Sequence, residues 1–204
     1  MFARSLATVR PGKRIMLFDH LIGRYLDSRR LHALFAALRS ALVDIARSEH
    51  AAMYTPPGDA GKREGQFPLH ADLYVPRYLF NVFDNTPSGP SGASLFLPVG
   101  ELRRILKGVP SLPHSTRSEI LSLFNSQATR DNYSAQYDLL HGRHRWVPEL
   151  ESKMRSQQMR ILLRSGQGYL LHDRIWLHGR EAPKGGVPID RFRRLIFNPV
   201  RSRC

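Results

Sequence analysis

Residues 67–74 read Phe-Pro-Leu-His-Ala-Asp-Leu-Tyr, an apolar run that contains one histidine and one aspartate. In an extended strand, side chains two residues apart point to the same face. His70 and Asp72 are therefore expected to converge on one point, while Ala71 faces the other way. An imidazole and a carboxylate placed in this way are two neighbouring ligands for a divalent metal ion.

A third ligand is expected from a second apolar run, residues 168–180, which read Gly-Tyr-Leu-Leu-His-Asp-Arg-Ile-Trp-Leu-His-Gly-Arg. His178 stands at the end of this strand-like segment. Two histidines and one carboxylate on one face of an octahedron leave the opposite face open, which is the arrangement of non-haem Fe(II) oxygenases. His70 and Asp72 alone are better explained by a hydrogen-bonded surface pair, so the metal-site interpretation depends on His178.

The sequence after His178 adds a family resemblance. His178 is followed by Gly-Arg, and residues 190–197 read Asp-Arg-Phe-Arg-Arg-Leu-Ile-Phe. From residue 65 to the end, the chain resembles the Fe(II)/2-oxoglutarate-dependent dioxygenases, in the branch of taurine dioxygenase and clavaminate synthase-like (asparagine oxygenase) proteins. The resemblance implies that His70, Asp72 and His178 are catalytic iron ligands, with 2-oxoglutarate and O₂ as cosubstrates.

The resemblance also implies residues that bind 2-oxoglutarate. Arg191 stands in a run similar to the Asp-Arg-Trp segment of the family, whose arginine holds the far carboxylate of the cosubstrate. An arginine suits this role because its planar fork pairs with both carboxylate oxygens. Arg193 and Arg194 are alternatives if the register differs. Ser94 lies in a segment similar to the Gly-Gly-x-Thr stretch, and its hydroxyl would add a contact.

Two further residues are candidates for binding the substrate. Trp176 shares the face of His178 if the strand is regular, so it either lines the pocket or packs in the core. Arg180 either contacts an anionic substrate or lies at the surface. Where Asp72 stands, the clavaminate branch usually has Glu, and the chain is short for the family.

Length, composition and charge limit the classes of protein to which the chain can belong. A length of 204 residues predicts one domain. The resemblance implies that this is an oxygenase domain, with an N-terminal support of about residues 1–65 and a catalytic barrel of about residues 66–204. A net charge of +14 indicates either an anionic partner (nucleic acid, anionic lipid or an anionic substrate) or only a solvated basic surface. The basic residues are scattered without interleaved aromatics, which favours a small substrate. One cysteine, Cys204, and no run long enough to span a membrane predict a cytoplasmic protein.

The expected fold is mainly β with flanking helices: a double-stranded β-helix, or cupin-like jelly roll, with an N-terminal amphipathic helix packed on the sheet. That helix is predicted from residue 28 to residue 45, and a second over 99–106. Thr116 and Glu119 predict a capping box. Residues 125–145 are predicted to be a substrate-selecting loop with solvated histidines at 141 and 144. Strands are predicted over 14–18, 78–83, 93–97, 158–163, 169–171, 175–177 and 192–197.

The sequence thus predicts an Fe(II)- and 2-oxoglutarate-dependent hydroxylase that acts on an aliphatic C–H of a small, anionic or amino-acid-like substrate. One alternative keeps the barrel and the metal without 2-oxoglutarate, as a cupin-like metalloenzyme. The other alternative is a basic non-catalytic module that binds nucleic acid or anionic lipid.

Overall fold

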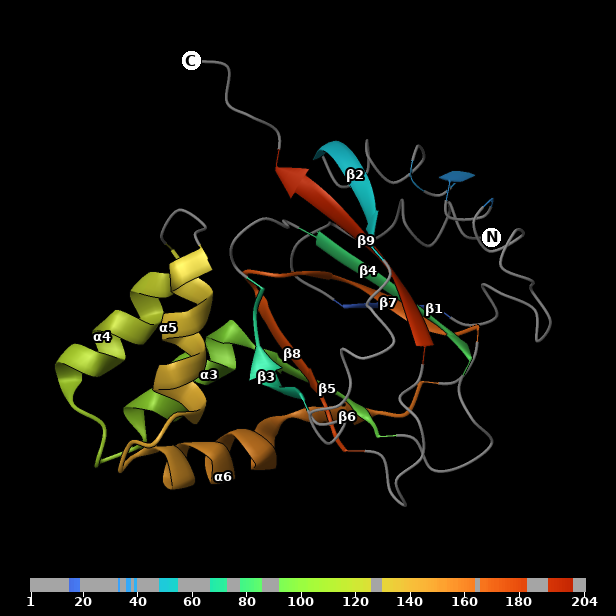
Figure 1. Cartoon of the computed structure of the whole chain (residues 1–204). Helices are drawn as coiled ribbons and strands as arrows, with labels where there is room; N and C mark the ends of the chain where they lie inside the picture. Colours follow the sequence, from blue (N-terminus) through green and yellow to red (C-terminus); the bar gives the residue numbers. More distant parts are fainter. Residues whose placement is uncertain are drawn as a thin grey trace, which may run out of the picture.

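A computed structural model gives the structure of the chain, which is built from β-strands and helices. It describes residues 15–18, 48–54, 67–72, 78–85, 92–125, 130–163, 166–182 and 191–199, and the single positions 33, 36, 37 and 39. Within these residues the chain forms two antiparallel sheets and four helices (Figure 1).

The strands form one sheet of five strands and one of four, and every pairing is antiparallel. The larger sheet has the order β1 (Met16–Phe18), β7 (Gly168–His172), β4 (Tyr78–Asn85), β9 (Arg191–Pro199), β2 (Ser48–Tyr54). The smaller sheet has the order β3 (Phe67–His70), β8 (Trp176–Arg180), β5 (Ser94–Pro98), β6 (Met159–Ile161). From β2 to β5, consecutive strands alternate between the two sheets.

Helices form a layer on the smaller sheet. They are α3 (Val99–Lys107), α4 (His114–Leu123), α5 (Arg130–His141) and α6 (Val147–Gln157), and all lie between β5 and β6 in the sequence. One buried cluster joins Leu95, Leu97 and Leu177 of the strands to Leu102 and Leu150 of the helices. The helical layer therefore covers the face of the smaller sheet that points away from the larger sheet (Figure 1).

A second apolar cluster fills the space between the sheets. Leu79 and Leu171 of the larger sheet pack in it with Phe96 and Trp176 of the smaller one. Because side chains alternate along a strand, the face of β8 that carries Trp176 also carries residues 178 and 180. The fold therefore directs His178 into the interior between the sheets.

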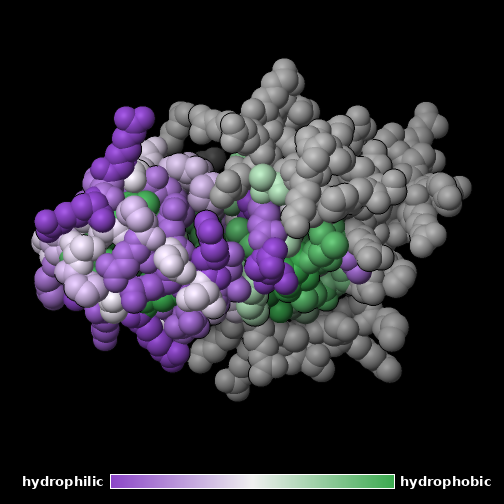
Figure 2. Space-filling model, turned by 90° about the horizontal axis from the view of Figure 1, so that it is seen from below, coloured by the Kyte–Doolittle hydropathy of each residue, from purple (hydrophilic) through white to green (hydrophobic). Residues whose placement is uncertain are grey.

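The outer side of the helical layer is mainly hydrophilic. Seen from below, purple and white residues cover the helices, and green residues gather nearer to the sheets (Figure 2). Helices α3 and α6 turn the apolar residues that they bury to the sheet, as expected for helices on the surface of a globular domain. None of the four described helices has the length and hydrophobicity that a bilayer-spanning helix needs.

Two local predictions from the sequence are wrong. Residues 125–145 are not a loop, because α5 occupies most of them; of the described positions in this helix only Gln136 and Leu140 are fully buried, so its sequence lacks an apolar stripe. The capping box is also wrong, since α4 begins at His114 after Pro113 and contains Thr116. Proline fits before the first turn because it has no N–H to leave unpaired there.

The predicted N-terminal helix falls mostly outside the described residues. Between residues 28 and 45, only positions 33, 36, 37 and 39 are described, and these are helical. The predicted packing of this helix on the sheet lies outside the described residues. The predicted strands from β1 and β4 to β9 agree with the structure within a few residues.

Strand β3 approaches β8 closely because residue 179 is a glycine. A Cβ atom at Gly179 would lie 2.6 Å from the carbonyl oxygen of Phe67 and 3.0 Å from the amide nitrogen of Leu69. These are backbone atoms, which cannot move without displacing β3. The Gly that follows His178 therefore has a steric role in bringing the two strands together.

We expect Gly179→Ala to lower the free energy of unfolding by about 1–3 kcal/mol, the usual range for overpacking. Gly100→Ala is the matched control, because nothing lies within 4 Å of its added Cβ on helix α3. Alanine there should raise stability by about 0.5–1 kcal/mol. Urea unfolding of both variants tests this, and a Gly179→Ala variant as stable as the wild type would contradict the close approach.

Candidate metal centre

The three residues predicted as metal ligands lie together at the edge of the smaller sheet. His70 ends β3 and is the cross-strand partner of His178 on β8. Asp72 follows just after the end of β3. The two imidazole ring centroids are 4.5 Å apart, and one ligand atom from each of the three residues lies within 4.8 Å of the others.

The two carboxylate oxygens of Asp72 have different partners. Oδ1 lies 3.5 Å from Nε2 of His70 and 3.8 Å from Nε2 of His178. Oδ2 accepts a hydrogen bond of 2.8 Å from the Arg194 guanidinium. One oxygen therefore faces both histidines, while the other is held by a fixed cation.

The hydrogen bond of His70 leaves its other ring nitrogen available to a metal ion. His70 Nδ1 is 2.7 Å from the carbonyl oxygen of Pro68, which can only accept, so Nδ1 carries the proton. In the neutral ring the lone pair is then on Nε2, which faces Asp72. Such a backbone contact commonly fixes the tautomer of a metal-bound histidine.

His178 provides a direct test of whether a metal fits. Its Nε2 atom is buried and makes no hydrogen bond within the described residues. The nearest carboxylate oxygens, on Asp173 and Asp72, are 3.5 Å and 3.8 Å away. A buried nitrogen without a partner costs free energy, and a divalent cation between these atoms would remove that cost. The residues present therefore fit a metal ion.

The electrostatics keep two of the ligands ready to bind. Burial tends to raise the pKa of the Asp72 carboxyl, but the charge of Arg194 and the hydrogen bond with His70 outweigh it and hold this pKa well below its ordinary value. Burial, and the neighbouring His70, lower the pKa of His178. At neutral pH, Asp72 is thus ionised and His178 is neutral, which are the forms that bind a metal.

The pKa of His70 is raised, in contrast to that of His178. Burial by itself lowers its pKa, but the hydrogen bond and charge of Asp72 outweigh burial and raise it. A metal ion that binds Nε2 of His70 must therefore displace the proton of any protonated fraction.

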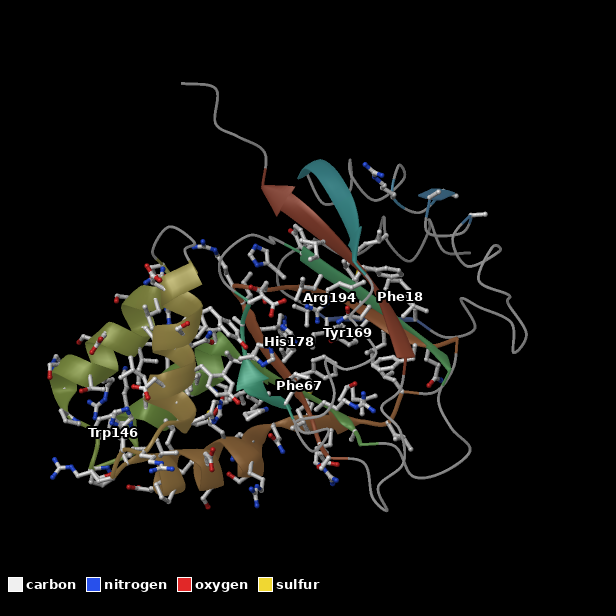
Figure 3. All side chains as sticks on the ribbon, in the orientation of Figure 1. Phe18, Phe67, Trp146, Tyr169, His178 and Arg194 are labelled. Atoms are coloured by element: carbon white, nitrogen blue, oxygen red, sulfur yellow. The ribbon has the colours of Figure 1, made fainter. Side chains whose placement is uncertain are left out.

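Arg194 is held in place by a polar chain that crosses the larger sheet. Its Nε donates to Oδ1 of Asn81 at 2.9 Å, and Nδ2 of Asn81 donates to the hydroxyl of Tyr169. These three residues come from the adjacent strands β9, β4 and β7. Figure 3 shows Arg194, Tyr169 and His178 gathered between the sheets, while Trp146 lies in the helical layer.

Asp173 is a further buried carboxylate at the centre. It has no exposed surface, and its Oδ1 accepts a 2.9 Å hydrogen bond from the backbone N–H of Asp72. Asp173, Asn81 and Tyr169 were not among the site residues predicted from the sequence. Their contacts join segments far apart in the chain, so no local sequence pattern signals them.

The other predicted site residues occupy different places. Ser94 and Arg180 are buried cross-strand partners on β5 and β8, two residues along the strands from the Phe96 and His178 pair. Trp176 is buried in the apolar cluster between the sheets. The side chain of Arg191 lies outside the described residues, so its binding of 2-oxoglutarate stays a prediction.

The two histidines of residues 125–145 are not equivalent. His141 was expected to be solvated, but its side chain is only 5% exposed, because α5 packs it against β3 and α6. His144 is more exposed and stacks on Trp146, with ring centroids 4.5 Å apart. The prediction of a solvated histidine is therefore wrong for His141.

Comparisons with known proteins give likenesses in structure alone. No protein-family model and no curated protein sequence matches the chain. Among solved structures, the PvcB protein of Pseudomonas aeruginosa is 12% identical, with 90% of this chain and 75% of that chain covered and a TM-score of 0.48. A taurine dioxygenase of Burkholderia xenovorans is 11% identical, with coverages of 97% and 80% and a TM-score of 0.46.

A third similar structure is an asparagine oxygenase in complex with Fe(II), 2S,3S-3-hydroxyasparagine and succinate. It is 10% identical, with 95% of this chain and 70% of that chain covered and a TM-score of 0.44. PvcB is an Fe- and alpha-ketoglutarate-dependent oxygenase, the class that the sequence resembles. At such identities and TM-scores the likeness carries no functional argument, so we derive the function from the site.

Removal of the Arg194 guanidinium should destabilise the protein. Arg194→Met leaves the partly buried Asp72 carboxylate and the Asn81 carbonyl without their donors, which should cost roughly 3 kcal/mol of unfolding free energy. Arg104→Met is the matched control, because Arg104 is 81% exposed in its ion pair with Glu101; its loss should cost less than about 1 kcal/mol. Equal effects in denaturant unfolding would argue against a special role for the Arg194 contact.

Proposed function

We propose that this chain is an Fe(II)- and 2-oxoglutarate-dependent oxygenase that hydroxylates an aliphatic C–H bond of a small, anionic or amino-acid-like substrate, with release of succinate and CO₂. One observation carries the proposal: Oδ1 of Asp72 faces Nε2 of both His70 and His178, at 3.5 Å and 3.8 Å. Two imidazoles and one carboxylate are the donor set that non-haem Fe(II) oxygenases use, with coordination positions left for other ligands.

Each ligand residue has a defined task in this proposal. His70, Asp72 and His178 would hold Fe(II), and the bound iron would supply oxygen activation at the expense of the 2-oxo acid. Arg194 occupies Oδ2 of Asp72, which favours binding through Oδ1 alone and keeps coordination positions available. The Pro68 carbonyl keeps the proton of neutral His70 on Nδ1.

The cosubstrate needs a cation for its far carboxylate. Arg191 is proposed for this role, with Arg193 as the alternative in register, because the guanidinium of Arg194 already binds Asp72 and Asn81. The cross-strand pair of Ser94 and Arg180 supports the presence of an anion between the sheets, because a buried guanidinium and hydroxyl favour one there. Arg180 and Trp176 are proposed to border the substrate, since both share the face of β8 that carries His178.

We also infer that the two sheets form a double-stranded β-helix within one domain of residues 1–204. The alternation of β2, β3, β4 and β5 between the sheets supports this inference, because such alternation generates the jelly roll. A jelly roll holds ligands between its sheets, where the three candidate iron ligands lie.

Iron binding is the first test. Purified protein should bind one Fe(II) under anaerobic conditions, and addition of 2-oxoglutarate should produce a weak visible absorption band. Asp72→Ala and His178→Ala should lose most of the iron while they keep the wild-type circular dichroism spectrum. Wild-type iron content in both variants would refute the ligand assignment.

The same measurements separate the two alternative functions. Iron binding without any effect of 2-oxoglutarate would favour a cupin-like metalloenzyme. Salt-sensitive nucleic-acid or lipid binding without iron would favour a binding module.

The second test concerns the arginine that binds the cosubstrate. Arg191→Met keeps the bulk of the side chain but removes the fork that pairs with a carboxylate. The loss of such a charge-assisted contact costs about 2 kcal/mol or more, so the affinity for 2-oxoglutarate should fall by roughly 30-fold or more, with iron binding retained.

Arg193→Met is the matched substitution for this measurement, because Arg194→Met would also remove the donor to Asp72. If Arg191→Met leaves the affinity unchanged and Arg193→Met abolishes it, the register of the cosubstrate assignment is wrong. If neither matters, 2-oxoglutarate itself is contradicted as the cosubstrate. Succinate release in the presence of candidate substrates then identifies the substrate class.

A further inference from the structure

Strand β3 carries candidate metal ligands although it lies at the edge of its sheet. It pairs with β8 on one side, and the described residues place no strand on its other side. An edge strand has backbone N–H and C=O groups that point away from its neighbour, and such groups are the first to exchange with water. The segment 69–72 must nevertheless hold His70 and Asp72 in a fixed direction.

Gln136 of helix α5 binds the free edge at the residue between the two ligands. Its Oε1 accepts from the N–H of Ala71 at 2.9 Å, and its Nε2 donates to the C=O of Ala71 at 2.8 Å. Both bonds are buried, and the Gln136 side chain is fully buried. One amide group thus makes the same pair of bonds that a residue of a neighbouring antiparallel strand would make.

His141 of the same helix binds the next outward-pointing backbone group. Its Nε2 donates to the carbonyl oxygen of Leu69 at 2.8 Å, and its Nδ1 lies 3.0 Å from Oε1 of Glu151 on helix α6. Because a carbonyl oxygen only accepts, Nε2 of His141 carries the proton that it shares with Leu69. Leu69 is thereby connected to the helical layer through two helices.

Helix α5 also touches a ligand side chain directly. The ring of Tyr133 meets the ring of His70 edge-on, with centroids 5.8 Å apart. The helix therefore contacts Leu69, His70 and Ala71 in sequence, beside β3 in Figure 1. These contacts come from residues 133, 136 and 141, which lie in a segment with little apolar character.

We propose that Gln136, assisted by His141, is a positioning residue of the metal centre: α5 replaces the missing neighbour of β3 and fixes the backbone that aims His70 and Asp72. The proposal rests on the proposed function only in taking a metal to bind at these residues. Loss of the Gln136 bonds would leave a buried N–H and C=O unpaired, and relaxation of residues 70–72 would follow. A metal holds its ligands within narrow distance limits, so such relaxation weakens binding before it unfolds the protein.

The test measures the affinity of the purified full-length chain for Co²⁺, whose visible spectrum reports its coordination. Gln136→Met keeps the length of the side chain and removes both hydrogen bonds. We expect its Co²⁺ affinity to fall by roughly tenfold or more, the usual effect of losing a group that orients a ligand, and the visible spectrum to change. The same substitution at Gln157, which is exposed at the end of α6, should leave both unchanged.

Gln136→Glu is the second variant and decides the matter if Gln136→Met does not fold. It still offers an acceptor to the Ala71 N–H, but it places a carboxylate oxygen against the Ala71 carbonyl. Its Co²⁺ affinity should therefore also fall. Wild-type Co²⁺ affinity in Gln136→Glu would show that one bond suffices. It would overturn the proposal that Gln136 positions the centre through both bonds to Ala71.

A purely structural role gives a different result. In that case the variants would lower the melting temperature of the metal-free and Co²⁺-bound protein equally, with unchanged affinity and spectrum, and this would overturn the proposal. Failure of the wild type to bind Co²⁺ or Fe²⁺ would instead overturn the metal centre, and the present inference with it. The two failures are thus distinguished by the behaviour of the wild-type protein.

Discussion

The pairing of β3 with β8 is the constraint on which the candidate centre depends. The register places His70 directly opposite His178, so two imidazoles from distant parts of the chain meet at one cross-strand position. Gly179 allows this approach, because any Cβ there would collide with the backbone of β3. Asp72 then follows His70 by two residues and faces the same side. A shift of one residue would turn the His70 side chain to the helical layer and separate the three ligands.

A polar network connects this pair of strands to the other sheet. Arg194 reaches from β9 to Asp72 and is oriented by Asn81, which in turn binds Tyr169. In an interior that is otherwise apolar, burial of any one of these groups alone would cost free energy. Together they supply one another's hydrogen-bond partners. The network lets the protein bury a carboxylate before any metal binds, and it assigns the two oxygens of Asp72 to different partners.

The helical layer has two functions in this structure. Its apolar stripes cover the outer face of the smaller sheet, as the shared cluster of Leu95, Leu177 and Leu102 shows. In addition, α5 pairs with the free edge of β3 through Gln136. The segment that carries His70 and Asp72 is therefore bordered by β8, by the larger sheet and by α5, and each border fixes a different part of it.

The sequence by itself determined the elements whose signal is local. The two-residue period of a strand was enough to place His70 and Asp72 on one face, and apolar, β-favouring runs located the strands from β4 to β9. Helix α5 was missed because it is anchored by Gln136, a polar residue whose partner, Ala71, is remote in sequence. Likewise, only the pairing of β9 with β4 decided that Arg194 stands opposite Asn81 and reaches Asp72. Local periodicity can be recognised in consecutive residues. Strand register, the covering of a sheet edge and buried polar contacts depend instead on which strands and helices meet, and only the tertiary structure decides that.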